Sequence, residues 1–135
     1  DQGYHTFCYA IRPHKGGWTA AGTVQAGYAL NVPLEAQFCP DAAEGSLPPE
    51  KSYFQVSKGN VILDTVKAAE DGDGIILRLY ESIGAKTRVS LQSALPFAEA
   101  LECNLVEENE RPAETEGSAV NFEMHPFEIK TFRLR

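Results

Sequence analysis

The chain has 135 residues, 43% of them hydrophobic, a formal net charge of −7 and an isoelectric point near 4.9. This size and composition suit one globular domain spanning residues 1–135 with its own core. The acidic charge would repel phosphate backbones, so no nucleic-acid partner is expected. No apolar run approaches the roughly 18 residues of a membrane-spanning helix, so no membrane partner is expected either.

Three cysteines, Cys8, Cys39 and Cys103, are odd in number and widely spaced. That pattern argues against a disulfide framework and indicates a reducing compartment. The chain begins at Asp1, within what reads as the approach to a strand, rather than at methionine. This start favours a piece of a longer protein, although processing would have the same effect.

The N-terminal third predicts one strand and one helix. Residues 4–11 (YHTFCYAI) alternate in the manner of a half-buried strand. Residues 19–30 (TAAGTVQAGYAL) predict a short helix, because Ala20, Val24 and Tyr28 recur on one helical face.

From residue 53 onward, alternating apolar and polar side chains predict one strand after another. The predicted strands cover residues 53–57, 60–68, 74–82, 86–92, 119–124 and 127–134. Residues 97–107 fit an amphipathic helix or a strand, and their mostly period-two spacing favours the strand; residues 39–52 and 109–118 predict surface loops. Short strands with frequent turns are typical of an antiparallel β-sandwich, so we expect an all-β fold with one short helix near the N-terminus.

The stretch Asp71-Gly72-Asp73-Gly74 looks like the start of a calcium loop. An EF-hand loop needs oxygen ligands at positions one, three and five and a glutamate at position twelve. Counted from Asp71, those last two positions hold Ile75 and Ser82. We therefore predict a hairpin turn that binds no calcium, because Asp-Gly pairs supply the positive φ values that a turn needs. Gly84-Ala85 predicts a second hairpin turn.

No spacing in the sequence predicts a metal site or a catalytic residue. His5 and Cys8 would face opposite sides of a strand, and His14 and His125 have no ligand at helical or hairpin spacing. Five acidic residues crowd one predicted solvated loop instead of flanking a cleft: Glu107, Glu108, Glu110, Glu114 and Glu116. There is no G-x-S-x-G elbow and no glycine-rich phosphate loop.

Trp18 is the one candidate sugar contact. It follows Gly16-Gly17, and an aromatic face can pack on a sugar. A single tryptophan after a loop is more often an anchor in a core, so both interpretations stay open.

Several motifs in order resemble the α-mannosidases of glycoside hydrolase family 38. Residues 1–18 resemble D-x-G-x-H-x-F-x-Y-x-x-x-P-H-x-G-x-W, and residues 30–34 (LNVPL) resemble the L-N-x-P-L that follows it. Residues 61–81, 100–107 (ALECNLVE) and 127–135 (FEIKTFRLR) are similar to later family elements. The matching residues of the first motif are Asp1, Gly3, His5, Phe7, Tyr9, Pro13, His14, Gly16 and Trp18. The likeness covers nearly the whole chain and is weakest in the loops at 39–52 and 108–118.

The resemblance implies a C-terminal β-sandwich domain of a large, cytoplasmic, retaining α-mannosidase. Members of this family hydrolyse α-mannosides with a divalent metal, usually zinc, and an aspartate nucleophile. Both belong to an N-terminal catalytic domain whose motifs are missing here, so no catalytic or metal-binding residue carries over. The implied partners are the preceding domains of the polypeptide and, for the full enzyme, an α-mannoside; the homo-oligomeric state stays open. The alternatives are a free-standing carbohydrate-binding module and a small protein-interaction domain.

The strands predicted at 74–82 and 127–134 carry apolar side chains on both faces. A β-bulge in the last strand would return them all to one core. Alternatively, part of the outer surface is buried against other domains, and this interpretation predicts that Ile76, Tyr80, Phe132 and Leu134 are partly exposed in the single chain.

Overall fold

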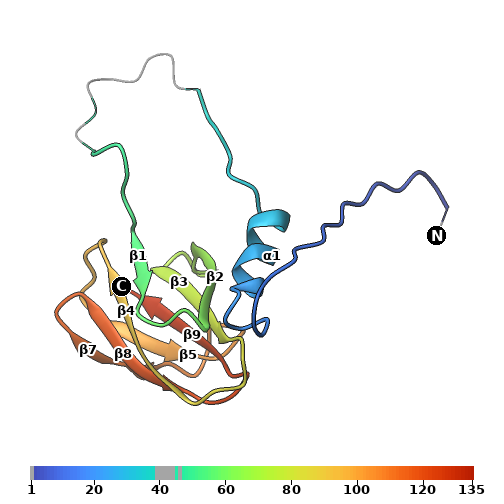
Figure 1. Cartoon of the computed structure of the whole chain (residues 1–135). Helices are drawn as coiled ribbons and strands as arrows, with labels where there is room; N and C mark the ends of the chain where they lie inside the picture. Colours follow the sequence, from blue (N-terminus) through green and yellow to red (C-terminus); the bar gives the residue numbers. More distant parts are fainter. Residues whose placement is uncertain (1, 39–44, 46) are drawn as a thin grey trace. The chain divides into compact units, whose positions relative to one another are not determined.

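The computed structural model describes residues 2–38, 45 and 47–135 (Figure 1). The chain divides into two compact units, Asp1–Pro40 and Asp41–Arg135. Among the described residues, the first unit holds the one α-helix and the second holds all of the strands.

The predicted short helix is confirmed as α1 (Thr23–Asn31) in the first unit. It begins four residues later than the sequence pattern predicts, because Gly22 takes a left-handed conformation with φ of 62° and residues 18–22 form turns instead. At its C-terminal end, the Val32 N–H donates to the Tyr28 carbonyl at 2.7 Å.

The predicted strand at residues 4–11 is not formed. The segment is extended, but no described strand pairs with it, and Tyr4, Phe7, Tyr9 and Ile11 are between 79% and 94% exposed. The alternation is therefore present without the sheet that would bury it.

The second unit is a sandwich of two antiparallel sheets, which confirms the predicted all-β class (Figure 1). The first sheet has the order β1-β4-β8-β7, with β1 at Phe54–Val56, β4 at Thr87–Ser93, β8 at Ala119–Met124 and β7 at Glu114–Glu116. The second has the order β2-β3-β9-β5-β6, with β2 at Val61–Ala68, β3 at Ile75–Glu81, β9 at Ile129–Leu134, β5 at Ala100–Cys103 and β6 at Arg111–Pro112.

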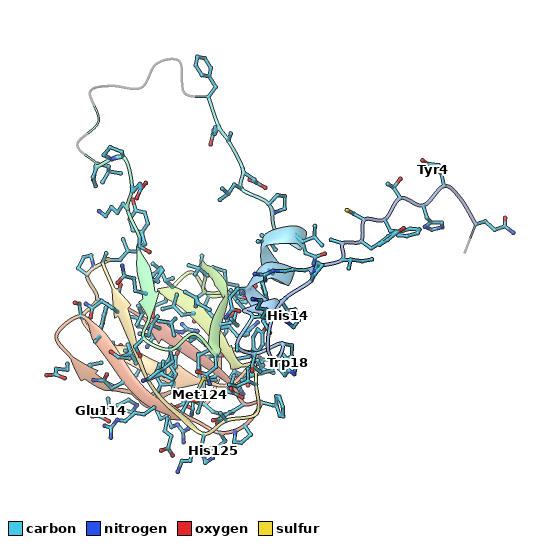
Figure 2. All side chains as sticks on the ribbon, in the orientation of Figure 1. Tyr4, His14, Trp18, Glu114, Met124 and His125 are labelled. Carbon is cyan, nitrogen blue, oxygen red and sulfur yellow. The ribbon has the colours of Figure 1, made fainter. Side chains whose placement is uncertain are left out.

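The core lies between the two sheets and is built from alternate residues of the strands. Leu77 and Leu79 of β3 and Val120 of β8 have no exposed surface, and Met124 lies inside the sandwich (Figure 2). The ring of Phe132 in β9 packs on that of Phe122 in β8 at 4.7 Å between centroids, which joins the sheets directly. Burial of each such side chain stabilises the fold by roughly 1.5–3 kcal/mol.

The strand that the spacing favoured within 97–107 is confirmed, but it is short, since β5 covers only Ala100–Cys103. Two other segments differ from the sequence prediction. The Gly84-Ala85 segment is not a hairpin turn, because β3 and β4 belong to different sheets. The predicted loop at 109–118 contains the short strands β6 and β7.

The predicted exposure of both faces of β3 and β9 is wrong for three of four residues. Phe132 and Leu134 face the core, because they pair with the core residue Leu77 and with Ile75, which packs against the core, in a register that has no bulge. Ile76 lies on the outer face and is still fully buried. Tyr80 is half-buried, as is Lys67 beside Ile76 in the register.

A loop of residues 104–110 lies over that outer face. Its backbone accepts hydrogen bonds from two outward-facing arginines: Arg78 donates to the Leu105 carbonyl at 2.9 Å, and Arg133 donates to the Glu107 carbonyl at 3.3 Å. The alternation of apolar residues along β3 and β9 does not predict that this loop covers their outer face.

Candidate functional site

The Asp71–Gly74 turn is a hairpin turn, as predicted. It joins the paired strands β2 and β3, and the Ala69 N–H donates to the Gly74 carbonyl at 3.0 Å. The Asp71 carboxylate accepts from the Asp73 N–H at 2.9 Å within the turn. Gly72 and Gly74 have φ values of 79° and 102°, which glycine adopts without strain.

Both carboxylates of this turn are bound by arginines at the end of the chain. Asp71 Oδ2 lies 2.7 Å from Arg133 Nη1, and Asp73 Oδ2 lies 2.7 Å from Arg135 Nε. The hydrogen bond from Arg133 lowers the pKa of Asp71 below its ordinary value. The oxygens that looked like calcium ligands therefore hold the hairpin to the C-terminal strand.

Arg133 is a buried cation surrounded by acidic groups. Its side chain is 2% exposed, and its Nε lies 2.9 Å from Glu110 Oε1. Glu107, which is also buried, lies 3.9 Å from Arg133 Nη2 and 2.8 Å from Lys67 Nζ. The Lys67 ammonium is the main cause of a lowered pKa at Glu107. The prediction of a wholly solvated acidic loop is thus wrong at Glu107.

Glu81 is a buried acid that stabilises the fold, and the sequence pattern does not predict this role. Its carboxylate is 1% exposed and accepts 2.8 Å and 2.7 Å hydrogen bonds from Asn60 Nδ2 and the Gly84 N–H. The backbone N–H groups of Ile83, Ala85 and Phe127 also donate to it, at 3.0, 3.1 and 3.1 Å. Burial opposes ionisation of Glu81, but these donors outweigh it and lower its pKa from 4.5 to about 2.

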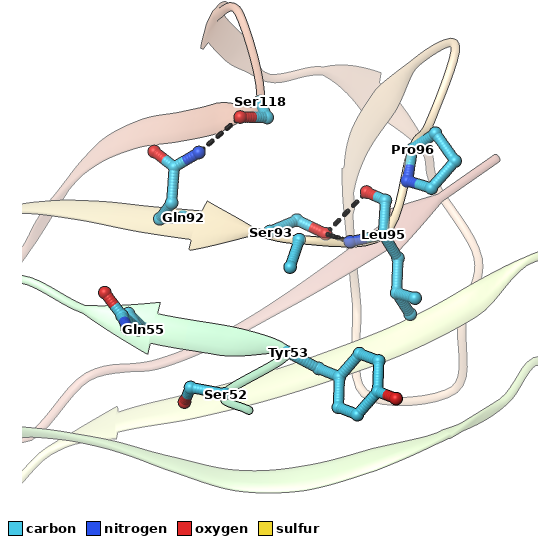
Figure 3. Close-up of a pocket in the computed structure, with 9 residues that line it drawn as sticks. Ser52, Tyr53, Gln55, Gln92, Ser93, Leu95, Pro96 and Ser118 are labelled. Atoms are coloured by element: carbon cyan, nitrogen blue, oxygen red, sulfur yellow. Dashed lines mark hydrogen bonds between the residues drawn. The ribbon is translucent and has the colours of Figure 1, made fainter. Parts of the chain in front are cut away.

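An uncharged groove of about 490 Å³ opens where β1 begins and β4 ends (Figure 3). Its lining contains no charged side chain and consists of Ser52, Tyr53, Gln55, Gln92, Ser93, Ala94, Leu95, Pro96 and Ser118. Gln55 and Gln92 are partners in the β1–β4 register, so their amides share one face of the sheet.

The rim of the groove is fixed by its own hydrogen bonds. Gln92 Nε2 donates to Ser118 Oγ, and the Leu95 N–H donates to Ser93 Oγ at 3.1 Å (Figure 3). The Tyr53 ring is 41% exposed, and the Lys51 ammonium lies 5.0 Å from the ring centroid. The lining is uncharged and combines amide and hydroxyl groups with apolar surface that includes the Tyr53 ring. It therefore suits an uncharged ligand that has both polar and apolar faces.

Trp18, the one candidate sugar contact, and the three histidines are all exposed. Trp18 precedes α1, is 48% exposed, and accepts a backbone hydrogen bond from Thr23 at its carbonyl. His5, His14 and His125 are all exposed. Within residues 2–38, 45 and 47–135, no three histidine, cysteine, aspartate or glutamate side chains are grouped closely enough to hold a metal ion.

Of the cysteines, Cys8 is exposed and Cys103 is buried, and burial raises the pKa of the Cys103 thiol. Cys39 lies outside the described residues. In the part of the chain that the structure describes, no helix is long and apolar enough to cross a membrane.

Known proteins support the resemblance seen in the motifs. Residues 60–132 match the family model for the glycosyl hydrolases family 38 C-terminal beta sandwich domain. The chain is 35% identical to Alpha-mannosidase G of Dictyostelium discoideum over 137 residues, which cover 99% of this chain and 13% of that protein. It is 43% identical to Alpha-mannosidase 2C1 of Homo sapiens over 110 residues, covering 79% of this chain and 10% of that protein.

Alpha-mannosidase 2C1 of Mus musculus is 34% identical over 139 residues, covering 99% of this chain and 13% of that protein. The chain therefore spans only 10% to 13% of the length of these relatives. The matched region 60–132 begins just before β2 and ends within β9, so it contains most of the sandwich. The chain belongs to the family of glycosyl hydrolase family 38 C-terminal β-sandwich domains.

Proposed function

We propose that this chain is a structural, accessory domain of a metal-dependent, retaining α-mannosidase. Three relatives are α-mannosidases, and the chain corresponds to a small share of each. In this proposal the glycosidic bond is broken by another part of the longer polypeptide, and the sandwich supports that part from outside.

The observation that supports the proposal is that the two buried carboxylates, Glu81 and Glu107, bind groups of the fold itself. A catalytic carboxylate must face a substrate across a cleft. Glu81 is instead enclosed by backbone N–H groups and Asn60, and Glu107 by Lys67, the Glu70 N–H and Arg133. Both acids therefore hold segments of the fold together.

In an α-mannosidase of this type the metal would act as a Lewis acid that orients and polarises the sugar. The described residues of this chain do not fit such an ion, because they bring together no group of three ligands. No step of the reaction is assigned to a metal bound by this part of the protein.

The test uses the longer natural polypeptide that contains this chain. Glu81→Gln should lower the melting temperature while kcat, KM and bound metal per folded molecule stay unchanged. Glu114→Gln is the matched control, since Glu114 lies exposed on β7 (Figure 2). A fall in kcat of about tenfold or more in Glu81→Gln, with an unchanged melting temperature, would contradict a structural role.

A second candidate function, carbohydrate binding, is favoured by the groove at β1 and β4. The amides of Gln55 and Gln92 can both donate to and accept from sugar hydroxyls, and the Tyr53 ring offers an apolar face. The probe is an α-linked mannose disaccharide, titrated into the 135-residue chain and followed by NMR.

Under this proposal, the resonances of Gln55 and Gln92 shift on titration, and Tyr53→Ala abolishes the shifts while Trp18→Ala retains them. The opposite pattern would assign sugar contact to Trp18. No shift in any protein up to about 10 mM disaccharide would reject carbohydrate binding at both positions.

A further inference from the structure

The segment of residues 4–11 has the side-chain geometry of a strand. Residues two apart face the same side of an extended chain, and the rings of Phe7 and Tyr9 are stacked at 6.3 Å between centroids with an interplanar angle of 28°. Ile11 is the next residue on that side. These three side chains are 81%, 79% and 87% exposed.

The segment also lacks the features that protect an exposed strand. Edge strands normally carry charged residues or proline, which discourage pairing with other chains. Three of the four edge strands of the sandwich follow this rule: β6 is Arg111–Pro112, β7 begins and ends with Glu114 and Glu116, and β2 contains charged residues. The fourth edge strand, β1, is uncharged but only three residues long, and a very short edge strand also discourages pairing. Residues 4–11 (YHTFCYAI) contain no proline, aspartate, glutamate, lysine or arginine.

Residues 4–11 are not part of the sandwich domain. The family match begins at residue 60, and residues 4–11 belong to the first compact unit, outside the sandwich. Two relatives nevertheless align with 99% of this chain while it spans 13% of their length. The segment is therefore shared with much longer proteins, most of whose length lies outside the region that matches this chain.

We propose that residues 4–11 form a β-strand in a sheet contributed by another part of the longer polypeptide, with Phe7, Tyr9 and Ile11 turned toward its core. Strand addition satisfies the backbone of the segment, and the sheet beneath buries its apolar side. This inference rests on the chain being part of a longer polypeptide and does not depend on the activity of that polypeptide.

A second copy of this chain is a poorer partner for the segment. Two copies of residues 4–11 would make a two-stranded ribbon, which is marginally stable in water without a sheet or helix to pack on. An existing sheet supplies both the pairing and the core.

The experiment compares hydrogen exchange in two proteins: the longer natural polypeptide and the 135-residue chain. Amides of residues 4–11 should exchange at least about a hundredfold more slowly in the longer polypeptide. The amides of Leu77 and Phe132, inside β3 and β9, serve as the internal standard and should be protected in both.

Fast exchange of residues 4–11 in the longer polypeptide would overturn the proposal. Protection of these amides in the 135-residue chain would also overturn it. In a monomer, such protection would mean that the segment pairs within the chain; in a dimer, it would mean that the segment pairs with a second copy. Size-exclusion chromatography with light scattering separates these two cases.

Two substitutions in the longer polypeptide test which side of the strand is buried. Tyr9→Asp should lower the melting temperature far more than Thr6→Asp, because residues 6 and 9 are an odd number apart and face opposite sides. Equal effects of the two would contradict the assigned orientation. Neither readout involves mannosidase activity, so failure here is separable from failure of the proposed function.

Discussion

The carboxylate of Glu81 accepts a hydrogen bond from the backbone N–H of Phe127, 46 residues further along the chain, at 3.1 Å. Glu81 ends β3, and Phe127 lies in the turn before β9 with a left-handed φ of 58°. The Phe127 ring in turn covers Gly84, where an added Cβ would lie 2.8 Å from the ring. One buried acid thus fixes two turns at the same end of the sandwich.

Glu81→Gln should destabilise the chain by about 2–3 kcal/mol. The amide keeps the size of the side chain, but its NH₂ group would face the N–H donors of Gly84, Ala85 and Phe127 or leave some of them unpaired. Urea unfolding of both proteins measures the difference. Glu116→Gln, at an exposed position of β7, should stay within about 0.5 kcal/mol of the native chain.

The stability contributed by Glu81 should depend on pH. Its folded-state pKa of about 2 lies below the ordinary 4.5, so its contribution is complete above pH 4.5 and is lost as the pH falls toward 2. The shift corresponds to about 3 kcal/mol. The gap in unfolding free energy between the native chain and Glu81→Gln should therefore close between pH 4.5 and 2. A gap that stays constant over that range would contradict a buried, ionised Glu81.

Most of the sandwich could be predicted from the sequence, because a strand with one face in a core must alternate. The predicted strands at 60–68, 74–82 and 86–92 correspond closely to β2, β3 and β4. Alternation says nothing about which strands pair, so the sequence predicts a hairpin at Gly84-Ala85, whereas this link crosses between the two sheets. Alternation also does not show whether a neighbouring sheet is present, so it predicts a strand at residues 4–11 that has no sheet to pair with in this structure.

The residues that hold the fold together were harder to predict, because their partners are distant in the sequence. The sequence predicts Glu107 in a solvated loop, because nothing near it in the sequence indicates that Lys67 and Arg133 enclose it. Glu81 reads as the polar end of a strand. A weak signal existed in Asn60, Gly84 and Ala85, since turn residues beside a carboxylate are typical of an anion held by backbone N–H groups.

Gly74→Ala should be much more destabilising than Gly72→Ala. Both glycines have positive φ, so alanine at either position is strained by about 1 kcal/mol. At Gly72 an added Cβ meets nothing within 4 Å, whereas at Gly74 it would lie 2.4 Å from the Leu134 carbonyl oxygen, which is backbone and must move. Thermal unfolding of the two variants checks this order. Equal decreases in melting temperature would contradict the prediction and would mean that the backbone of β9 at Leu134 can move away at little cost.

Calcium should not bind the Asp71–Gly74 turn at submillimolar concentration. The two carboxylates are already paired with Arg133 and Arg135, and the fifth and twelfth loop positions offer no carboxylate. A calorimetric titration up to about 1 mM calcium should give no saturable heat, and the melting temperature should not rise. Submillimolar binding that Asp73→Ala abolishes would contradict this prediction.

The 135-residue chain should not hydrolyse aryl α-mannosides, with or without added zinc. Retaining hydrolysis needs two carboxyl groups about 5–5.5 Å apart on either side of the bond. The buried acids of the sandwich are instead bound by its own arginines, lysines and N–H groups, and the uncharged groove at β1 and β4 has no acid in its lining. Release of the aryl alcohol should therefore equal that of a mock-purified control. Turnover above the control that is lost on Glu81→Gln or Glu107→Gln, in a variant whose circular dichroism spectrum is unchanged, would show that the chain carries catalytic residues of its own.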